Sequence, residues 1–209
     1  MKEKKLIAFD LYDTCFSIQG EHLCYAQLFS DLWISDRRRE LKKVLLTSNT
    51  PIENIIPDIL PKNKIDEYLY IYRNALRNEI NSVWLFPETS SVLFALKERW
   101  YKIAAISNIA QPYIESLNTL LPHTFDYEVL SCNVGLIKPD KKIFDCLKNI
   151  SWYHADQIVM VGNSLSSDVQ GAKNADIDPV HVNRASSWII QHKGYISISS
   201  LEQLLDILK

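Results

Sequence analysis

Four short segments of the chain carry residue types that can transfer or bind a charged group. Asp10 and Thr14 follow the apolar run 6–9, and a carboxylate that leaves a buried strand is well supported as a nucleophile. Ser107 and Asn108 follow a second apolar run and could donate hydrogen bonds to an anion. Each segment also has a plain structural interpretation, as an Asp-rich turn and as a helix cap, respectively.

The other two segments would supply positive charge and metal ligands. Lys138 precedes Pro139 and Asp140, where it could neutralise an oxyanion or a phosphate, although an isolated surface lysine looks the same. In the polar stretch 162–172, Asp168 opens a helix and Gly171 allows close packing. Oxygen ligands from such a loop suit Mg²⁺, whereas alone Asp168 would pass as a helix N-terminal acid.

The elements that must position these segments form an α/β pattern. Short apolar runs alternate with amphipathic stretches of helical period, which predicts a Rossmann-like parallel sheet flanked by helices. Ligands bind such sheets at the carboxyl ends of the strands, where all four segments lie. The expected strands are 5–9, 102–106, 127–130, 157–161 and 179–182, and the expected helices are 89–100, 112–121, 141–150, 167–175 and a closing helix over 198–208.

Residues 17–85 show a different pattern. Helix-like spacing recurs over 21–33, 35–46 and 64–81, and no convincing strand interrupts it. We therefore expect an all-helical domain over residues 17–85, inserted into a core made of residues 1–16 and 86–209.

Composition excludes several classes of protein. The chain has 209 residues and a net charge of -2, whereas a general nucleic-acid binder usually carries a basic excess. No apolar run approaches the ~20 residues of a membrane span, and the N-terminus lacks a signal-peptide pattern. The four cysteines and five histidines show no zinc-ligand spacing. We expect a cytoplasmic protein with reduced thiols that acts on a small molecule, without a membrane or nucleic-acid partner; oligomeric state is left open.

Taken together and in order, the four segments resemble the motifs of the haloacid dehalogenase superfamily of hydrolases, and residues 17–85 lie where that family places a smaller cap domain. The resemblance implies that Asp10 attacks the substrate and forms a covalent aspartyl intermediate, while Ser107 and Lys138 hold the transferred group and Thr14 belongs to the same motif. It implies a substrate pocket that includes Tyr12, Asp13 and Asn108. In magnesium-dependent members the metal ligands would be Asp10, the backbone carbonyl of Tyr12, Asn163 and Asp168.

Tyr12 departs from the pattern of the phosphatases in this superfamily, which carry a second Asp there to protonate the leaving alkoxide. A tyrosine at this position resembles the haloalkanoic-acid dehalogenases, in which a halide leaves without a proton. Three hypotheses follow: a Mg²⁺-dependent phosphatase of a small phosphate ester, slightly ahead; a 2-haloacid dehalogenase; and a catalytically weakened binding or regulatory protein. The dehalogenases bind halide through a cap arginine, for which the candidates are Arg37, Arg38, Arg39, Arg73 and Arg77.

Two further positions depart from the family pattern. Trp100 and Asp176 stand where relatives usually have a turn glycine, so we expect a local adjustment of the loop backbone there.

Overall fold

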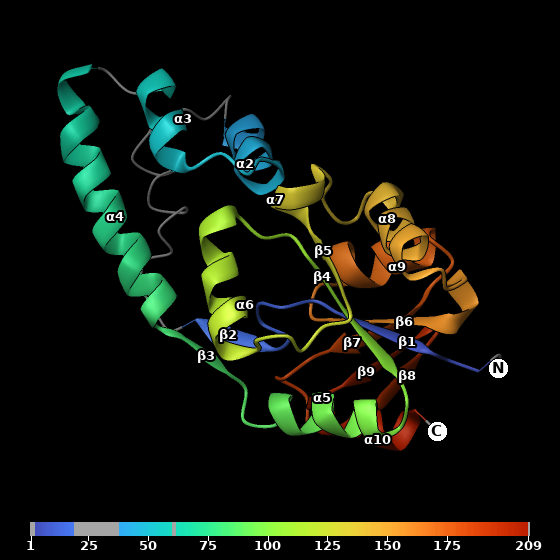
Figure 1. Ribbon diagram of the computed structural model, residues 1–209. Helices are drawn as coiled ribbons and strands as arrows, with labels where there is room; N and C mark the ends of the chain where they lie inside the picture. The colour runs from blue at the N-terminus through green and yellow to red at the C-terminus, as the bar shows by residue number, and fades with distance from the viewer. Residues whose placement is uncertain (1–2, 19–37, 60–61, 209) are drawn as a thin grey trace.

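A seven-stranded sheet forms the centre of the molecule (Figure 1). The computed structural model describes residues 3–18, 38–59 and 62–208. The strand order is β5-β4-β1-β6-β7-β9-β8, and every neighbouring pair is parallel except β8 with β9. The strands of this sheet are β1 (Leu6–Phe9), β4 (Lys102–Ser107), β5 (Tyr127–Leu130), β6 (Ile158–Gly162), β7 (Asp178–Val182), β8 (Ile190–His192) and β9 (Tyr195–Ile198).

Helices cover both faces of the sheet because alternate residues of the central strand point to opposite sides. In β1, Ile7 and Phe9 pack into one apolar cluster with α5, α6 and α10, whereas Leu6 and Ala8 pack into another with α8 and α9. The α-helices are α2 (Arg38–Thr47), α3 (Ile52–Ile59), α4 (Ile65–Asn81), α5 (Thr89–Glu98), α6 (Ile114–Leu120), α7 (Ser131–Val134), α8 (Lys141–Ser151), α9 (Gln170–Asn174) and α10 (Leu204–Ile207).

The remaining helical segments are single turns. They are η1 (Lys62–Lys64), η2 (Gln111–Tyr113), η3 (Ala155–Gln157), η4 (Leu165–Val169), a π-turn, and η5 (Leu201–Gln203).

The expected Rossmann-like sheet is confirmed, and the five expected strands match β1, β4, β5, β6 and β7. The C-terminal prediction was wrong in part. Ile198 ends strand β9, and the closing helical turns begin at Leu201. The strands β8 and β9 were missed, because a three-residue edge strand and its short partner carry too little pattern to be read.

In the described part of the insertion, helices lie between two short strands at its ends. Helices α2, α3 and α4 lie together to one side of the sheet (Figure 1). The chain leaves and re-enters the core through a two-stranded antiparallel ribbon, β2 (Phe16–Ile18) and β3 (Val83–Leu85). The expectation of no strand within 17–85 was therefore wrong. The helix expected over 21–33 lies outside the described residues.

Candidate active site

Three predicted catalytic side chains, those of Asp10, Ser107 and Lys138, meet the predicted metal ligand Asp168 at the carboxyl ends of β1, β4 and β6. The Ser107 hydroxyl donates to Asp10 Oδ1 over 2.9 Å, and Lys138 Nζ donates to the same oxygen over 2.8 Å. Lys138 Nζ also donates to Asp168 Oδ1 over 2.7 Å. The backbone N–H of Asp10 donates to the Val161 carbonyl, which fixes the end of β1 against β6. The sheet thus converts four separate sequence segments into one hydrogen-bonded cluster.

Lys138 is the only cation of this cluster among the described residues. Its side chain is almost fully buried, and Nζ also donates to the Ile106 carbonyl over 2.8 Å. Burial opposes its charge, but the carboxylates of Asp10 and Asp168 outweigh burial and raise the pKa of Lys138 above its ordinary value. One ammonium thus faces two carboxylates, so the cluster has an excess of negative charge that a bound cation would offset.

Asp168 is fixed from two directions. Its Oδ2 accepts a hydrogen bond from the Ser164 backbone N–H over 2.9 Å. A Cβ added to Gly162 would stand only 2.3 Å from the same carboxylate oxygen, so only glycine leaves room for this side chain. At Gly171 a Cβ would stand 2.8 Å from the Phe144 ring, which confirms that this glycine serves close packing.

Asn108 contacts the backbone of Lys138. Its Nδ2 donates to the Lys138 carbonyl over 2.9 Å, and the Lys138 N–H donates to its Oδ1 over 2.7 Å. Ser131 acts similarly on the neighbouring loop, because its hydroxyl pairs with both the N–H and the carbonyl of Ile109. Both polar atoms of the Asn108 amide are therefore engaged in holding Lys138, whereas the sequence suggested contact with substrate.

Tyr12 turns away from the catalytic cluster. Its hydroxyl donates to the Tyr113 carbonyl over 3.2 Å, and its ring packs against the rings of Phe16 and Tyr113. Burial, reinforced by the Glu79 carboxylate, raises the pKa of Tyr12 to about 12. The phenol stays protonated at neutral pH and supplies no acid in place of the carboxyl that the phosphatase pattern has at this position.

Asp13 and Thr14 complete the loop that follows the nucleophile. Asp13 is exposed and has a φ of 60°, a left-handed conformation that Asp adopts more readily than most residues. Desolvation and the nearby Asp10 charge raise the pKa of the Asp13 carboxyl. Thr14 is fully buried, and its Oγ1 has no hydrogen-bond partner among the described residues. The Thr14 carbonyl accepts a bond from Arg184 over 2.7 Å.

The donors around the cluster suit a hard cation. Asp10 and Asp168 supply carboxylate oxygens bound to one shared ammonium, and oxygen donors of this kind are the ligands that Mg²⁺ prefers. No group of three or more Asp, Glu, His or Cys side chains suited to a metal occurs among the described residues. Backbone or amide oxygens would have to complete the shell.

Asn163, the amide among the predicted metal ligands, is held through its backbone by a buried histidine. His181 pairs through Nε2 with the Asn163 carbonyl and through Nδ1 with the Ser197 hydroxyl, both at 3.0 Å. Because a carbonyl can only accept, we assign the proton to Nε2. Burial lowers the pKa of His181, which favours this neutral form. The spacing of the five histidines in the sequence carries no signal of this contact.

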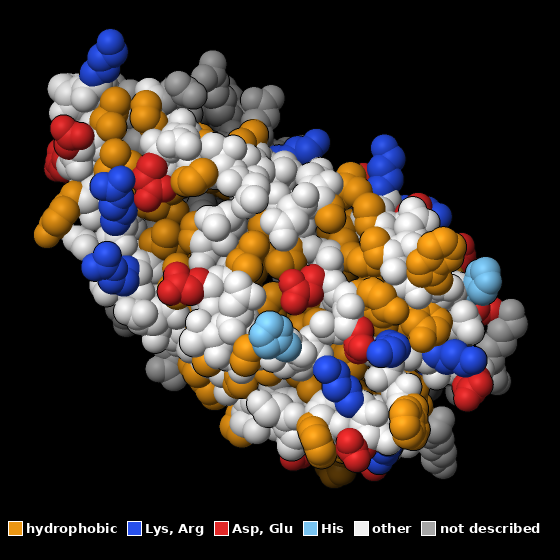
Figure 2. Space-filling model, in the orientation of Figure 1, with side chains coloured by type: hydrophobic (Ala, Val, Ile, Leu, Met, Phe, Trp, Pro, Cys, Tyr) orange, Lys and Arg blue, Asp and Glu red, His pale blue; other side chains and the backbone are white. Residues whose placement is uncertain are grey.

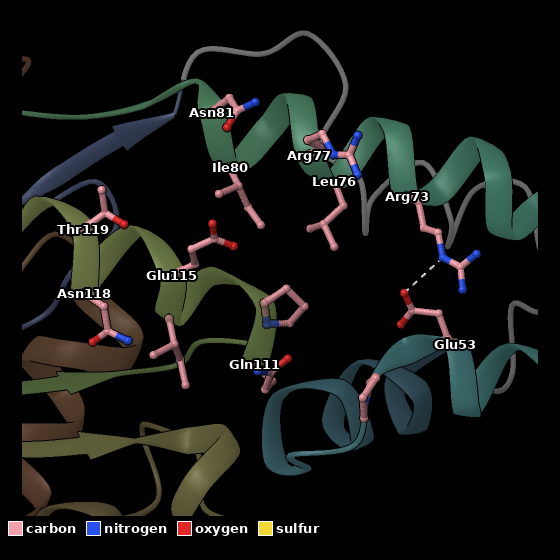
Figure 3. A pocket seen from close by; sticks show the side chains of 13 residues that line it. Glu53, Arg73, Leu76, Arg77, Ile80, Asn81, Gln111, Glu115, Asn118 and Thr119 are labelled. Atoms are coloured by element: carbon pink, nitrogen blue, oxygen red, sulfur yellow. Dashed lines mark hydrogen bonds and ion pairs between the residues drawn. The ribbon is translucent and has the colours of Figure 1, made fainter.

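A separate cavity of about 890 Å³ lies between α4 of the insertion and η2 and α6 of the core (Figure 3). Arg73 and Arg77 line it rather than the catalytic cluster, and Arg73 pairs with Glu53 over 3.4 Å. Both acidic and basic side chains are exposed on the side of the molecule where α4 lies (Figure 2). Of the other cap arginines considered for halide binding, Arg37 lies outside the described residues, and the structure does not describe the side chains of Arg38 and Arg39.

Comparison with known proteins places this site in a family. Residues 22–182 match the family described as haloacid dehalogenase-like hydrolase, a span that contains Ser107, Lys138 and Asp168 and begins after Asp10. A glyceraldehyde 3-phosphate phosphatase of Methanothermobacter thermautotrophicus is 38% identical over 100 residues, 47% of this chain and 44% of the relative. The pyrimidine 5'-nucleotidase YjjG of Escherichia coli is 32% identical over 131 residues, 57% of this chain and 56% of the relative. The chain spans about half the length of these relatives.

Solved structures share the fold at low sequence identity. A predicted phosphoglycolate phosphatase from Haemophilus somnus has a TM-score of 0.70 and 18% identity over 100% of both chains. A 2-haloacid dehalogenase from Pseudomonas syringae has a TM-score of 0.68 and 21% identity over 98% of both chains. The fold therefore does not separate the two chemistries. In the part of the chain that is described, no helix is both long enough and apolar enough to span a bilayer. The family match over most of the chain nevertheless identifies it: the protein belongs to the haloacid dehalogenase-like hydrolases.

Proposed function

We propose that this chain hydrolyses a small phosphate ester through a covalent phosphoaspartate on Asp10. The observation that carries the proposal is the buried cluster in which Ser107 and Lys138 both donate to Asp10 Oδ1. Neither bond reaches Oδ2, which is left as the attacking oxygen. The names of the relatives that are phosphatases or nucleotidases support this chemistry over halide release.

The reaction would proceed in two steps. Asp10 Oδ2 attacks phosphorus, an Asp–O–P bond forms, and the bond from phosphorus to the ester oxygen breaks. Water then attacks the phosphoaspartate, so that the Asp10 carboxylate and inorganic phosphate are released. Lys138 and the Ser107 hydroxyl would hold the phosphoryl oxygens and stabilise their charge in both transition states.

We further propose that Mg²⁺ binds beside this cluster, held by Asp10, the Tyr12 carbonyl and Asp168, with Asn163 at its edge. The bound cation would neutralise charge on the phosphoryl group. Two observations support a bound cation: the cluster has more carboxylates than ammonium groups, and the atoms that would bind the metal are oxygens. Residues 17–85 would then act as a cap over the substrate, joined to the core by the β2–β3 ribbon.

One observation favours 2-haloacid dehalogenation as a second candidate. Because the Tyr12 hydroxyl is bonded to the Tyr113 carbonyl, the leaving group receives no proton from this residue, and a halide needs none. Against this candidate, Arg73 and Arg77 line the outer cavity and are not among the residues that contact Asp10.

A single assay panel tests the proposal. Hydrolysis of p-nitrophenyl phosphate is measured with and without Mg²⁺, beside halide release from 2-chloropropionate. We expect Mg²⁺-dependent hydrolysis that falls by about 10³-fold or more in Asp10→Asn. The control is Asp140→Asn, which removes an exposed carboxyl that caps α8. Halide release without phosphatase activity would select the dehalogenase. Turnover of neither substrate, with Asp10→Asn indistinguishable from wild type, would leave a binding protein.

A further inference from the structure

The chain crosses between the core and the insertion twice, and the two crossings are bonded to each other. The first crossing is 14–16 and the second is 86–89. The Phe86 N–H donates to the Cys15 carbonyl over 3.1 Å, and the Thr89 hydroxyl donates to the same carbonyl over 3.0 Å. Beyond them the β2–β3 ribbon continues the pairing. The first crossing is also the continuation of the loop that carries Asp10.

Arg184, just after β7, contacts both crossings. One terminal nitrogen donates to the Thr14 carbonyl over 2.7 Å, and the other donates to Glu88 Oε1 over 2.6 Å. The guanidinium carbon lies 3.4 Å from the centroid of the Phe86 ring. The planar, two-pronged guanidinium is suited to this task, because a lysine ammonium could not reach both oxygens while stacking on a ring.

The partner of Arg184 is held in its charged form. Burial is the largest single influence and acts against the Glu88 carboxylate, but the bond from Arg184, its charge and the bonds from backbone N–H groups together outweigh burial and lower the pKa of Glu88. The Glu88 side chain is only 10% exposed, so loss of either partner would leave the other charge poorly solvated. The Arg184 Nε is buried without a partner among the described residues, so the contacts of the side chain are concentrated in its two terminal nitrogens and its flat face.

We propose that Arg184 is a positioning residue that clamps the two crossings and thereby fixes the loop after Asp10. It acts through the Thr14 carbonyl and does not touch the reacting atoms. The clamp holds the core side of the connection, so that a movement of the insertion takes place beyond it and leaves Asp10 aligned with Ser107 and Lys138. The catalytic consequence of this inference rests on the proposed phosphatase function.

The test compares Arg184→Lys with a matched variant. Arg99 also donates to two backbone carbonyls, those of Leu205 and Leu208, but through one nitrogen and away from the crossings, so Arg99→Lys makes the same substitution where the clamp is not affected. Hydrogen–deuterium exchange should show protection reduced by about 10-fold or more at the amides of Asp13 and Phe86 in Arg184→Lys alone. With p-nitrophenyl phosphate and Mg²⁺, kcat should fall by about 10- to 100-fold while KM changes by less than about 3-fold.

The outcomes separate the two claims. If wild-type protein does not hydrolyse p-nitrophenyl phosphate, the phosphatase proposal fails, and the exchange experiment still decides whether the clamp exists. Unchanged exchange in Arg184→Lys overturns the clamp, and reduced protection with an unchanged kcat overturns its role in positioning. Should Arg184→Lys fail to fold, Glu88→Gln is the second variant. It keeps the bond from Arg184 to the Thr14 carbonyl and removes only the Glu88 charge. We then expect a smaller loss of protection from hydrogen–deuterium exchange, confined to residues 86–89.

Discussion

At the scale of single residues, the proposed phosphatase chemistry depends most on Tyr12. A buried phenol whose pKa is raised to about 12 and whose hydroxyl is bonded to the Tyr113 carbonyl is a much weaker proton donor to a leaving group than the carboxyl of the phosphatase pattern. Leaving groups that are stable as anions, such as p-nitrophenolate, would depart without help, whereas an alkoxide would not.

Two substitutions at this position should have different effects on the rate. Tyr12→Asp restores a carboxyl group and should raise hydrolysis of an alkyl ester such as glycerol phosphate toward the ~10²-fold gain of a general acid, with a smaller effect on p-nitrophenyl phosphate. Tyr12→Phe is the matched control. It should leave both rates within about 2-fold and lower the free energy of unfolding by about 1 kcal/mol for one lost hydrogen bond. Equal changes on both esters in Tyr12→Asp would show that the missing acid does not limit the reaction.

At the scale of elements, two helices end with an unusual residue. After α5, the Trp100 N–H donates to the Lys97 carbonyl and the Tyr101 N–H donates to the Leu96 carbonyl, the two bonds of a Schellman motif. α9 ends the same way, around Asp176. Both residues have positive φ, 67° for Trp100 and 61° for Asp176. The resemblance to the family located these positions, and the structure shows why a glycine is usual there: the left-handed backbone disfavours a side chain.

Trp100→Gly should therefore stabilise the protein. The side chain is 93% exposed, so its removal loses little packing, and relief of the left-handed backbone should add about 1 kcal/mol to the free energy of unfolding. Asp176→Gly should gain less, because Asp tolerates this conformation better. Trp188→Gly is the control. It removes a 75% exposed tryptophan that lies outside the residues with positive φ, and the added chain flexibility should leave stability equal or lower. Urea unfolding of the three variants tests this, and a gain of stability at Trp188 would refute the argument.

At the scale of the whole molecule, the elements that could be predicted from the sequence are those with a strong local pattern of apolar residues. The sequence shows directly the buried apolar runs that form β1, β4, β5, β6 and β7. It also shows the polar residues that follow these runs, and the topology of a parallel sheet places those residues at one edge. The ribbon β2–β3 could not be predicted from the sequence. Each of its two strands has only three residues, and each is stabilised by pairing with the other, which lies at the opposite end of the insertion.

The backbone contacts of Asn108 could not be predicted for a similar reason. Its type suggested an anion donor, and only the fold shows both amide atoms bonded to Lys138. The contacts of Arg184 with Thr14 and Glu88 also join parts of the chain more than 90 residues apart. Contacts of this kind leave no periodic signal.

Because the Arg184–Glu88 pair links such distant parts of the chain, it should also affect the response of the whole fold to acid. The folded pKa of Glu88 lies below its unfolded value, so between the two values the unfolded chain binds more protons. The pair thus stabilises the fold fully above the ordinary glutamate pKa of about 4.3, and this contribution is lost as pH falls through the folded pKa.

Glu88→Gln should flatten the dependence of the free energy of unfolding on pH between about 6 and 3, because the amide cannot be protonated in this range. Asp126→Asn provides an independent comparison. The pKa of Asp126 is also lowered: burial opposes its charge, but the bond from Lys102, the charge of Lys102 and the bond from the Ile103 N–H together outweigh burial. Since the two pairs are separate, the losses of pH dependence should add in the double variant. Urea unfolding at several pH values measures the slopes, and a Glu88→Gln curve parallel to that of the wild type would show that this pair does not contribute to acid sensitivity.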